Sequence, residues 1–494
     1  MSNKVFPSED LPEEVLEHIF SFLQLSDRKS ASLVCTKWEK LTFSRRILRK
    51  VVLNIPINNI DRMFDLRKTK RRYRNVFVIL DRHEFRFQML MITLNLFAAY
   101  VESLRCVGHL NTKQLCMLLR RLPNLQQLTV GINVDDDDDD DEDDDDDEPL
   151  EDFSLQIESL DAPNVTQLGI RLSAPAEARN VLPVMRRLAP QLKNVNLYST
   201  GYFIPLEQLQ FPKAEVLNIG GNLCNTENDW VLRTFFAGFK LLKEVRLDSN
   251  IQEIALDVIT SACPAIELLK FDGPRFNPIP FHLLGRLKYL KTLGLGEVND
   301  DPDISLQCSP LESVENLSLD LSECEESSIG RLRYLLPNII AMDVTLRDDW
   351  NIEKGLGHVC QSFQGLKRLE ISDNSTWIPK SSISLLAVEH LDQLEELTFK
   401  NIRTQIVDIP PNPHLKRLVL KSHCWLFNED MLELARQYPN LRYFEHEPNT
   451  IQGIAAFKSQ LVNCAVHCRP HATNIISRHD RDFLENLNHR TPLI

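Results

Sequence analysis

The chain has 494 residues, of which 43% are apolar, so it can bury a large core and is not a disordered protein. Its formal charge of −14 results from 56 basic and 70 acidic residues. The fourteen acidic residues from Asp135 to Glu148 account for the whole imbalance, because the charges without them are 56 against 56. The remaining surface therefore has no charge bias toward nucleic acid or an anionic membrane.

The cysteines indicate a reducing compartment. Eleven of them are scattered singly, with neither a CxxC motif nor a regular spacing. With no signal peptide at its start, the chain fits a cytoplasmic or nuclear setting. The most apolar window, residues 89–101, is shorter than the roughly 20 residues that span a bilayer. We expect a buried helix there and no membrane partner.

Residues 11–41, "LPEEVLEHIFSFLQLSDRKSASLVCTKWEKL", predict three short helices. Pro12 suits the first position of a helix. Ser26 or Asp27 is expected to cap a second helix that runs to Cys35, and Trp38 marks a third. The first helix has a wide apolar face, formed by Val15, Leu16, Ile19, Phe20 and Leu23. Because about 35 residues cannot enclose an adequate core, these helices must lean on the rest of the chain or on another protein.

This stretch resembles the F-box family, whose pattern is Leu-Pro, a helix with spaced aliphatic residues, and Val-Cys-x-x-Trp. The resemblance implies that residues 1–47 bind the small Skp-type adaptor of a cullin-RING ubiquitin ligase. The adaptor-binding positions would be Leu11, Pro12, Val15, Ile19, Leu33, Val34 and Trp38. Arg28 and Lys29 depart from the family, which usually has apolar residues there, and we expect them to weaken the contact of the second helix. The alternative is a plain amino-terminal cap.

The segment "RKTKRRYR", residues 67–74, precedes an expected strand at Val76. It is interpreted either as a solvated loop, which we favour, or as a nuclear localisation signal.

From residue 48 the pattern L-x-x-L-x-L recurs, where L is any aliphatic residue. Units begin at residues 48, 73, 101, 125, 165, 192, 214, 242, 266, 290, 314, 339, 366, 394, 415 and 441. The L-x-L part alternates like a strand with one buried face. Helical patterns lie between the strands, and prolines are expected to end several of them, at Pro123, Pro190, Pro264, Pro337 and Pro439. An asparagine after several strands, at Asn133, Asn222, Asn250, Asn374 and Asn449, is expected to bond the turn backbone.

These units resemble leucine-rich repeats in their longer, helix-containing form. The resemblance implies an α/β solenoid over residues 48–449, with about sixteen units, a curved parallel sheet and outer helices. Residues 450–494 would form a capping helix over the last open edge and then a mobile tail. The acidic run 135–148 falls in the longest unit and is interpreted as a loop insert. It is a solubilising spacer, a dock for a basic partner, or a partner for residues 67–74.

No catalytic pattern is found, and we predict a protein that is not an enzyme and needs no cofactor or metal. Cys464, His467, Cys468 and His471 would share one face of a continuous helix, but Pro470 should end that helix. Four ligands from one short segment rarely close a tetrahedron around zinc, so these residues are interpreted as incidental.

Substrate-binding candidates lie in the last third of the repeats. Trp350, Trp377 and Trp425 occupy similar places in their units, and Trp is enriched at interface hot spots. The basic residues Lys400, Arg417 and Lys421 are expected to point outward from nearby strands. Each of the six also has a structural interpretation, as a plug of its own repeat or as part of a solvated face.

The two resemblances together imply the substrate-recognition subunit of an SCF-type ubiquitin ligase. The chain would be a monomer within a hetero-complex that includes the adaptor, through it a cullin, and an unidentified protein substrate. The alternative is a leucine-rich-repeat scaffold with a degenerate F-box and no role in a ligase.

Overall fold

The computed structural model describes most of the chain between residues 11 and 468. The described residues are 11–23, 25–55, 66, 69, 71–80, 84–108, 110, 112–132, 160, 162–172, 175–199, 204–221, 229–248, 252–272, 280–297, 308–321, 326–346, 352–373, 386–400, 409–421, 428–446 and 451–468. The chain divides into two compact units, residues 1–363 and 364–494. Among the described residues, no helix is long and apolar enough to cross a membrane.

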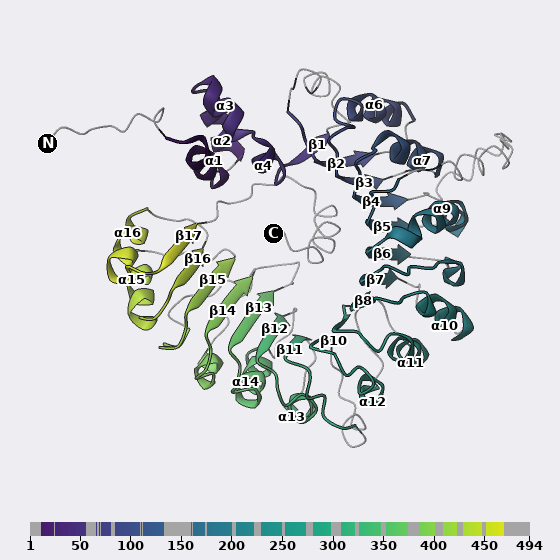
Figure 1. Cartoon of the computed structure of the whole chain (residues 1–494). Coiled ribbons are helices and arrows are strands. Elements are labelled where there is room, and N and C mark those ends of the chain that lie inside the picture. The colour runs from purple at the N-terminus through teal and green to yellow at the C-terminus, as the bar shows by residue number, and fades with distance from the viewer. Residues whose placement is uncertain are drawn as a thin grey trace, which may run out of the picture. The chain divides into compact units, whose positions relative to one another are not determined.

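The first unit begins with four short helices and continues as a parallel sheet with helices along one face (Figure 1). Its strands are β1 (Val52–Ile55), β2 (Asn75–Leu80), β3 (Ser103–Gly108), β4 (Gln127–Ile132), β5 (Gln167–Leu172), β6 (Asn194–Ser199), β7 (Val216–Gly221), β8 (Glu244–Asp248), β9 (Leu268–Phe271), β10 (Thr292–Glu297), β11 (Asn316–Asp320) and β12 (Ala341–Leu346). Its helices are α1 (Glu13–Ser21), α2 (Leu25–Ser32), α3 (Thr36–Thr42), α4 (Arg45–Leu48), α6 (Glu84–Leu94), α7 (Thr112–Arg121), α9 (Pro175–Leu188), α10 (Asp229–Ala237), α11 (Glu253–Ala262), α12 (Phe281–Leu284), α13 (Glu326–Leu335) and α14 (Ile352–Ser362), with 3₁₀ turns η2 (Ala189–Gln191) and η3 (Leu206–Gln208).

The second unit repeats this arrangement on a smaller scale. It contains β13 (Arg368–Asp373), η5 (Leu386–His390), β14 (Glu396–Lys400), β15 (Arg417–Lys421), α15 (Asn428–Gln437), β16 (Tyr443–His446), α16 (Ile451–Gln460) and β17 (Ala465–Cys468). Its strands pair in chain order and in parallel, from β13 to β17.

The strands follow the repeat pattern. From the second unit start at residue 73 to the last at 441, each strand begins two residues after the start of its unit. Successive strands are in register, so the aliphatic positions line up, as Leu217, Val245 and Leu269 do across β7, β8 and β9. These three side chains are fully buried. The expected α/β solenoid of leucine-rich repeats is confirmed.

The prolines end their helices as expected. The helices α7, α9, α11, α13 and α15 each end two residues before the proline predicted to stop them. In four repeats the residue after a proline is an asparagine whose side chain bridges to the preceding repeat. Asn124 Nδ2, for example, donates to the Ala99 carbonyl at 2.8 Å, and Asn164, Asn338 and Asn440 make similar bonds. The asparagines that were expected after the strands lie outside the described residues.

Two expectations need correction. The closing helix exists as α16, but it ends at Gln460 and is not the last element, because β17 follows and pairs with β16. The window 89–101 is only partly helical, since α6 ends at Leu94 and residues 95–100 form turns.

Gly221 is required by the backbone at the end of β7. Its φ is +72°, and a Cβ there would lie 1.7 Å from the Ser199 carbonyl oxygen. Gly330, within α13, is exposed, and a Cβ there would meet nothing within 4 Å. The two glycines therefore offer a matched pair for testing the packing of the repeats.

We predict opposite effects of alanine at these two positions. Gly221→Ala should destabilise the protein by about 1–3 kcal/mol or more. The alanine would have to adopt a left-handed conformation, and its Cβ would clash with the backbone of Ser199. Gly330→Ala should stabilise it by about 0.5–1 kcal/mol through helix propensity. Urea unfolding followed by circular dichroism checks both signs, and an unchanged midpoint for Gly221→Ala would contradict the assigned backbone.

A second prediction concerns the thiols. Burial raises the pKa of Cys106, Cys263 and Cys360 to about 12, so these thiols stay protonated at pH 8. Cys35 is exposed. A short pulse of iodoacetamide on the folded protein, read by peptide mass spectrometry, should label Cys35 and spare the other three. A urea-unfolded sample is the control, in which all four should react alike.

Candidate functional site

The amino-terminal helices form a small core of their own. Leu16, Phe20, Ala31 and Ile47 are buried together, and four partly buried residues pack on them: Leu11, Leu23, Trp38 and Leu41. The rings of Phe20 and Trp38 meet edge to face, with centroids 5.0 Å apart. Cys35 caps α3, since its Sγ accepts a hydrogen bond from the Trp38 backbone N–H at 3.5 Å. The sequence pattern that includes Cys35 and Trp38 therefore fixes the start of α3.

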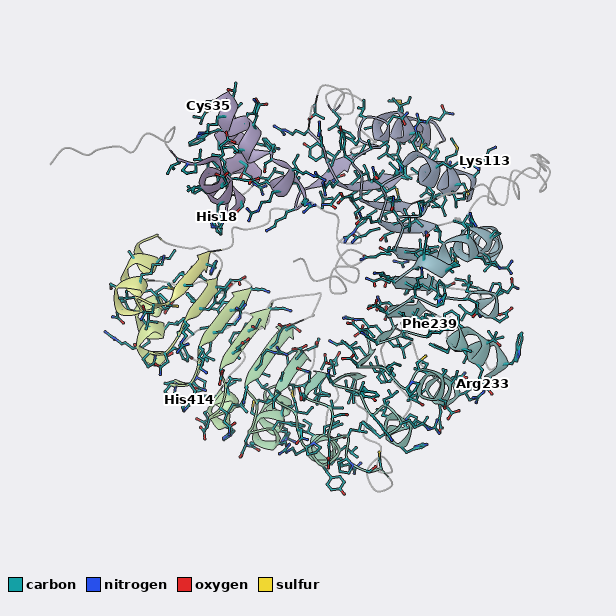
Figure 2. The ribbon with its side chains drawn as sticks, viewed as in Figure 1. His18, Cys35, Lys113, Arg233, Phe239 and His414 are labelled. Carbon is teal, nitrogen blue, oxygen red and sulfur yellow. The ribbon has the colours of Figure 1, made fainter. Side chains whose placement is uncertain are left out.

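Six apolar side chains of this module face solvent, and we call them the amino-terminal apolar set. They are Val15, Ile19, Phe22, Leu25, Leu33 and Val34. The first three follow each other by four and three residues, so they lie on one side of α1 and its last turn. Leu33 and Val34 lie in the turn between α2 and α3. Figure 2 labels the neighbours of both parts, His18 beside Ile19 and Cys35 beside Val34.

The exposure of this set is large. Leu33 is 87% exposed, Phe22 70% and Val34 64%. Isolated exposed apolar residues are ordinary, but a gathering of them marks an interaction site. The module therefore presents a gathering of apolar side chains at its surface.

The predicted adaptor-binding residues divide into two groups. Val15, Ile19, Leu33 and Val34 are exposed, as direct contact requires, and so is Pro12. Leu11 and Trp38 pack on the core instead and support the exposed residues from below. Phe22 and Leu25 are also exposed but are not among the predicted positions, although the spacing of Phe22 from Val15 and Ile19 is a helical signal that could have included it.

The two residues that depart from the F-box pattern behave differently. The guanidinium of Arg28 folds back, and its Nε donates to the Leu23 carbonyl at 2.9 Å. Burial lowers the pKa of Arg28. It therefore braces the turn between α1 and α2. Lys29 is exposed on α2. The boundaries of α2 also differ from the prediction, because the helix starts at Leu25, ahead of the expected caps.

The basic segment 67–74 contributes to the fold through its last residues. Arg71 lies 3.4 Å from the centre of the Phe43 ring, and Arg72 lies 4.9 Å from that of Tyr100. Arg74 is nearly buried and pairs with Glu102 at 2.6 Å. Arg71, Arg72 and Arg74 are thus engaged in contacts within the protein. They lie just before β2, as the favoured interpretation has it, but Arg74 is buried and not solvated as that interpretation expected.

The basic substrate candidates lie on adjacent strands of the second unit. Lys400 and Lys421 are paired in register between β14 and β15. Lys400 forms an ion pair with Glu370. Arg417 lies 4.0 Å from Glu396 and 4.1 Å from the centre of the Tyr443 ring. All three side chains are partly exposed on the same face of the strands. Trp350, Trp377 and Trp425 lie outside the described residues.

The cysteine and histidine cluster near the end does not form the helix that was considered. Residues 465–468 are β17, so the helical spacing does not apply. Cys464 is buried, which raises its pKa to about 11, while His467 stacks on Tyr443 with ring centroids 4.9 Å apart. Among the described residues, no three His, Cys, Asp or Glu side chains could together hold a metal ion.

Comparison with known proteins adds one family and several distant structures. Residues 8–54 match the F-box-like family model. No curated protein matches the chain. Rad7, solved in complex with Elc1 from yeast, is 12% identical, with a TM-score of 0.30 over 92% of this chain and 93% of that one. The leucine-rich-repeat protein LegL7 of Legionella pneumophila is also 12% identical, with a TM-score of 0.38 over 69% and 97%.

An internalin of Listeria monocytogenes is 13% identical, with a TM-score of 0.28 over 77% of this chain and 83% of that one. The repeat assignment rests on the strand register and spacing of this chain, and the amino-terminal assignment on the family match. The chain has an F-box-like region at residues 8–54, followed by leucine-rich repeats.

Proposed function

We propose that the chain is the substrate-recognition subunit of an SCF-type ubiquitin ligase. In this proposal the F-box-like region binds a Skp-type adaptor, and the repeats hold a protein substrate. The observation that carries the proposal is the amino-terminal apolar set, six exposed apolar side chains within residues 15–34, in the region that matches the F-box-like family.

The energetics favour a protein partner. Full burial of a Leu, Val, Ile or Phe side chain is worth about 1.5–3 kcal/mol. Phe22, Leu33 and Val34 are each more than 60% exposed, so most of that free energy is still available to a partner. Leu11 and Trp38 would act indirectly, by holding α1 and α3 in place.

The remainder of the complex follows from this role. The adaptor would connect the chain to a cullin, and the chain itself would act without catalytic groups, as a monomer within a hetero-complex in the cytoplasm or nucleus. The partly exposed Lys400, Arg417 and Lys421, with the three tryptophans, stay our candidates for substrate contact. The acidic run 135–148 stays a candidate spacer, dock for a basic partner, or partner for residues 67–74.

The second candidate is a leucine-rich-repeat scaffold whose F-box-like region no longer binds an adaptor. The observation in its favour is Lys29, an exposed charge on α2 where the family usually has an apolar residue. Arg28 gives it less support, because its side chain is directed back to Leu23. Adaptor capture separates the two candidates.

We predict that two charges placed in the amino-terminal apolar set strongly weaken adaptor capture. The wild-type chain should co-purify with a Skp-type adaptor and a cullin. The double variant Phe22→Asp/Leu33→Asp should bind at least about 30-fold more weakly, because buried aspartates leave unpaired charges in an apolar interface. The measurement is adaptor affinity by surface plasmon resonance, with cullin recovery as a second readout.

Val462→Asp is the matched control, since Val462 is 82% exposed outside the F-box-like region, and it should bind like wild type. Lys29→Leu should bind at least as well as wild type. If the wild type and Lys29→Leu both fail to capture adaptor, the scaffold replaces the ligase receptor as the conclusion.

A further inference from the structure

One column of residues crosses the sheet of the first unit just before the strands begin. Each member donates its backbone N–H to the carbonyl of the equivalent residue in the preceding repeat, as Lys243 does to Glu215 at 2.9 Å. We call this the pre-strand column. Over six repeats its members are Lys193, Glu215, Lys243, Glu267, Lys291 and Glu315. Lysine and glutamate alternate over these six repeats, and the uncharged Thr166 and Ile340 occupy the column before and after them.

Alternation gives charge compensation. Adjacent parallel strands lie about 4.8 Å apart, so each lysine has a carboxylate beside it in a neighbouring repeat. One of these pairs is close, with Lys291 Nζ 3.1 Å from Glu267 Oε2. This part of the column is electrically neutral.

In the second unit the alternation holds for three residues and then ends. The column there runs Lys367, Glu395, Lys416, Arg442 and Ala465. Lys416 pairs with Glu395 at 2.8 Å. Arg442 stands where a glutamate would continue the pattern, with Lys416 on one side and Ala465 on the other. Among the residues that the structure describes, no carboxylate pairs with Arg442.

A pocket of about 440 Å³ lies at the break. It is lined by Lys367, Asp392, Gln393, Glu395, Pro413, His414, Lys416, Asn440 and Arg442. Two hydrogen bonds hold residues of its lining, from Asn440 Nδ2 to the Pro413 carbonyl and from the His414 N–H to Asn412 Oδ1, both at 2.8 Å. Figure 2 labels His414.

The charges in this pocket do not balance. Three permanent cations face two carboxylates, and one carboxylate is already held by Lys416. The hydrogen bond from Lys416 lowers the pKa of Glu395, and the positive charges of Lys416, Lys367 and His414 lower it further. The lining therefore has an excess of positive charge, and Arg442 lies next to Lys416 in the column without an ion pair among the described residues.

A phosphate group fits this arrangement better than a second carboxylate. A carboxylate would bring one charge, as Glu395 already does. A phosphate monoester carries about −1.5 to −2 charges at pH 7 and three acceptor oxygens. Lysine and arginine side chains that immediately precede adjacent strands, with an imidazole beside them, can donate to several of those oxygens at once.

We propose that this pocket binds a phosphate group between Lys416 and Arg442, with His414 as a third donor. The group is supplied by a phosphorylated side chain of a partner protein or by free inorganic phosphate. The site is separate from the amino-terminal apolar set, and phosphate binding does not depend on the adaptor.

The test is a binding assay on the full-length chain. The probes are a fluorescein-labelled neutral peptide with one phosphoserine, its unphosphorylated counterpart, and inorganic phosphate as competitor. Arg442→Glu restores the alternation and should weaken phosphopeptide binding at least about tenfold. Glu395→Gln removes the competing carboxylate and should strengthen binding about threefold. Lys291→Gln, at the same column in the first unit, should leave affinity within about twofold of wild type.

The readout is fluorescence anisotropy at two salt concentrations, with circular dichroism to check that each variant folds. Arg442→Glu should melt no lower than wild type, since it recreates the pattern of the first unit. If inorganic phosphate displaces the labelled phosphopeptide at the same concentration as the unlabelled phosphopeptide does, the site is assigned to the free ion. If the unlabelled phosphopeptide displaces it at a lower concentration, the site is assigned to a partner protein. Absence of binding to both probes, or equal affinity of wild type, Arg442→Glu and Glu395→Gln, overturns the proposal.

Discussion

The fold depends on the lateral hydrogen bonds between parallel strands of successive repeats. A single strand of four to six residues leaves its backbone N–H and C=O groups unpaired, and only the strands on either side can satisfy them. Because of this constraint, the strand of each repeat lies in register with the strand of the neighbouring repeat. Equivalent residues therefore form columns that cross the sheet, and each column has its own chemistry.

Different columns stabilise the protein in different ways. Aliphatic columns such as Leu217, Val245 and Leu269 fill the core. The asparagine bridges, such as Asn124 to Ala99, satisfy carbonyls in the turns before the strands. The pre-strand column carries charged side chains, and these avoid electrostatic repulsion only where opposite charges are adjacent. A break in that order, as at Arg442, is consequently a local feature that the fold does not require.

The repeats could be predicted from the sequence because aliphatic spacing is a property of each unit alone. β17 was missed because Asn463, two residues before it, replaces the aliphatic residue with which a unit begins. The prolines that end the helices act locally and were predictable, while the asparagine bridges and the charged column join residues in different repeats. Such relations become visible only when the register is known. In the F-box-like region, the exposure of Phe22 was predictable from its helical spacing to Val15 and Ile19, a signal that the family pattern does not contain.

The contacts of the basic segment also bear on how the protein unfolds. Arg71 lies against Phe43, at the end of the amino-terminal helices, while Arg72 and Arg74 contact Tyr100 and Glu102 near β3. Asn75, at the start of β2, donates to the Arg49 carbonyl just after α4. These contacts tie the helical module to the first repeats through side chains that belong to neither core. Local opening of the module must break them, so its amide protons should exchange together with those of β2 and β3 as one cooperative unit.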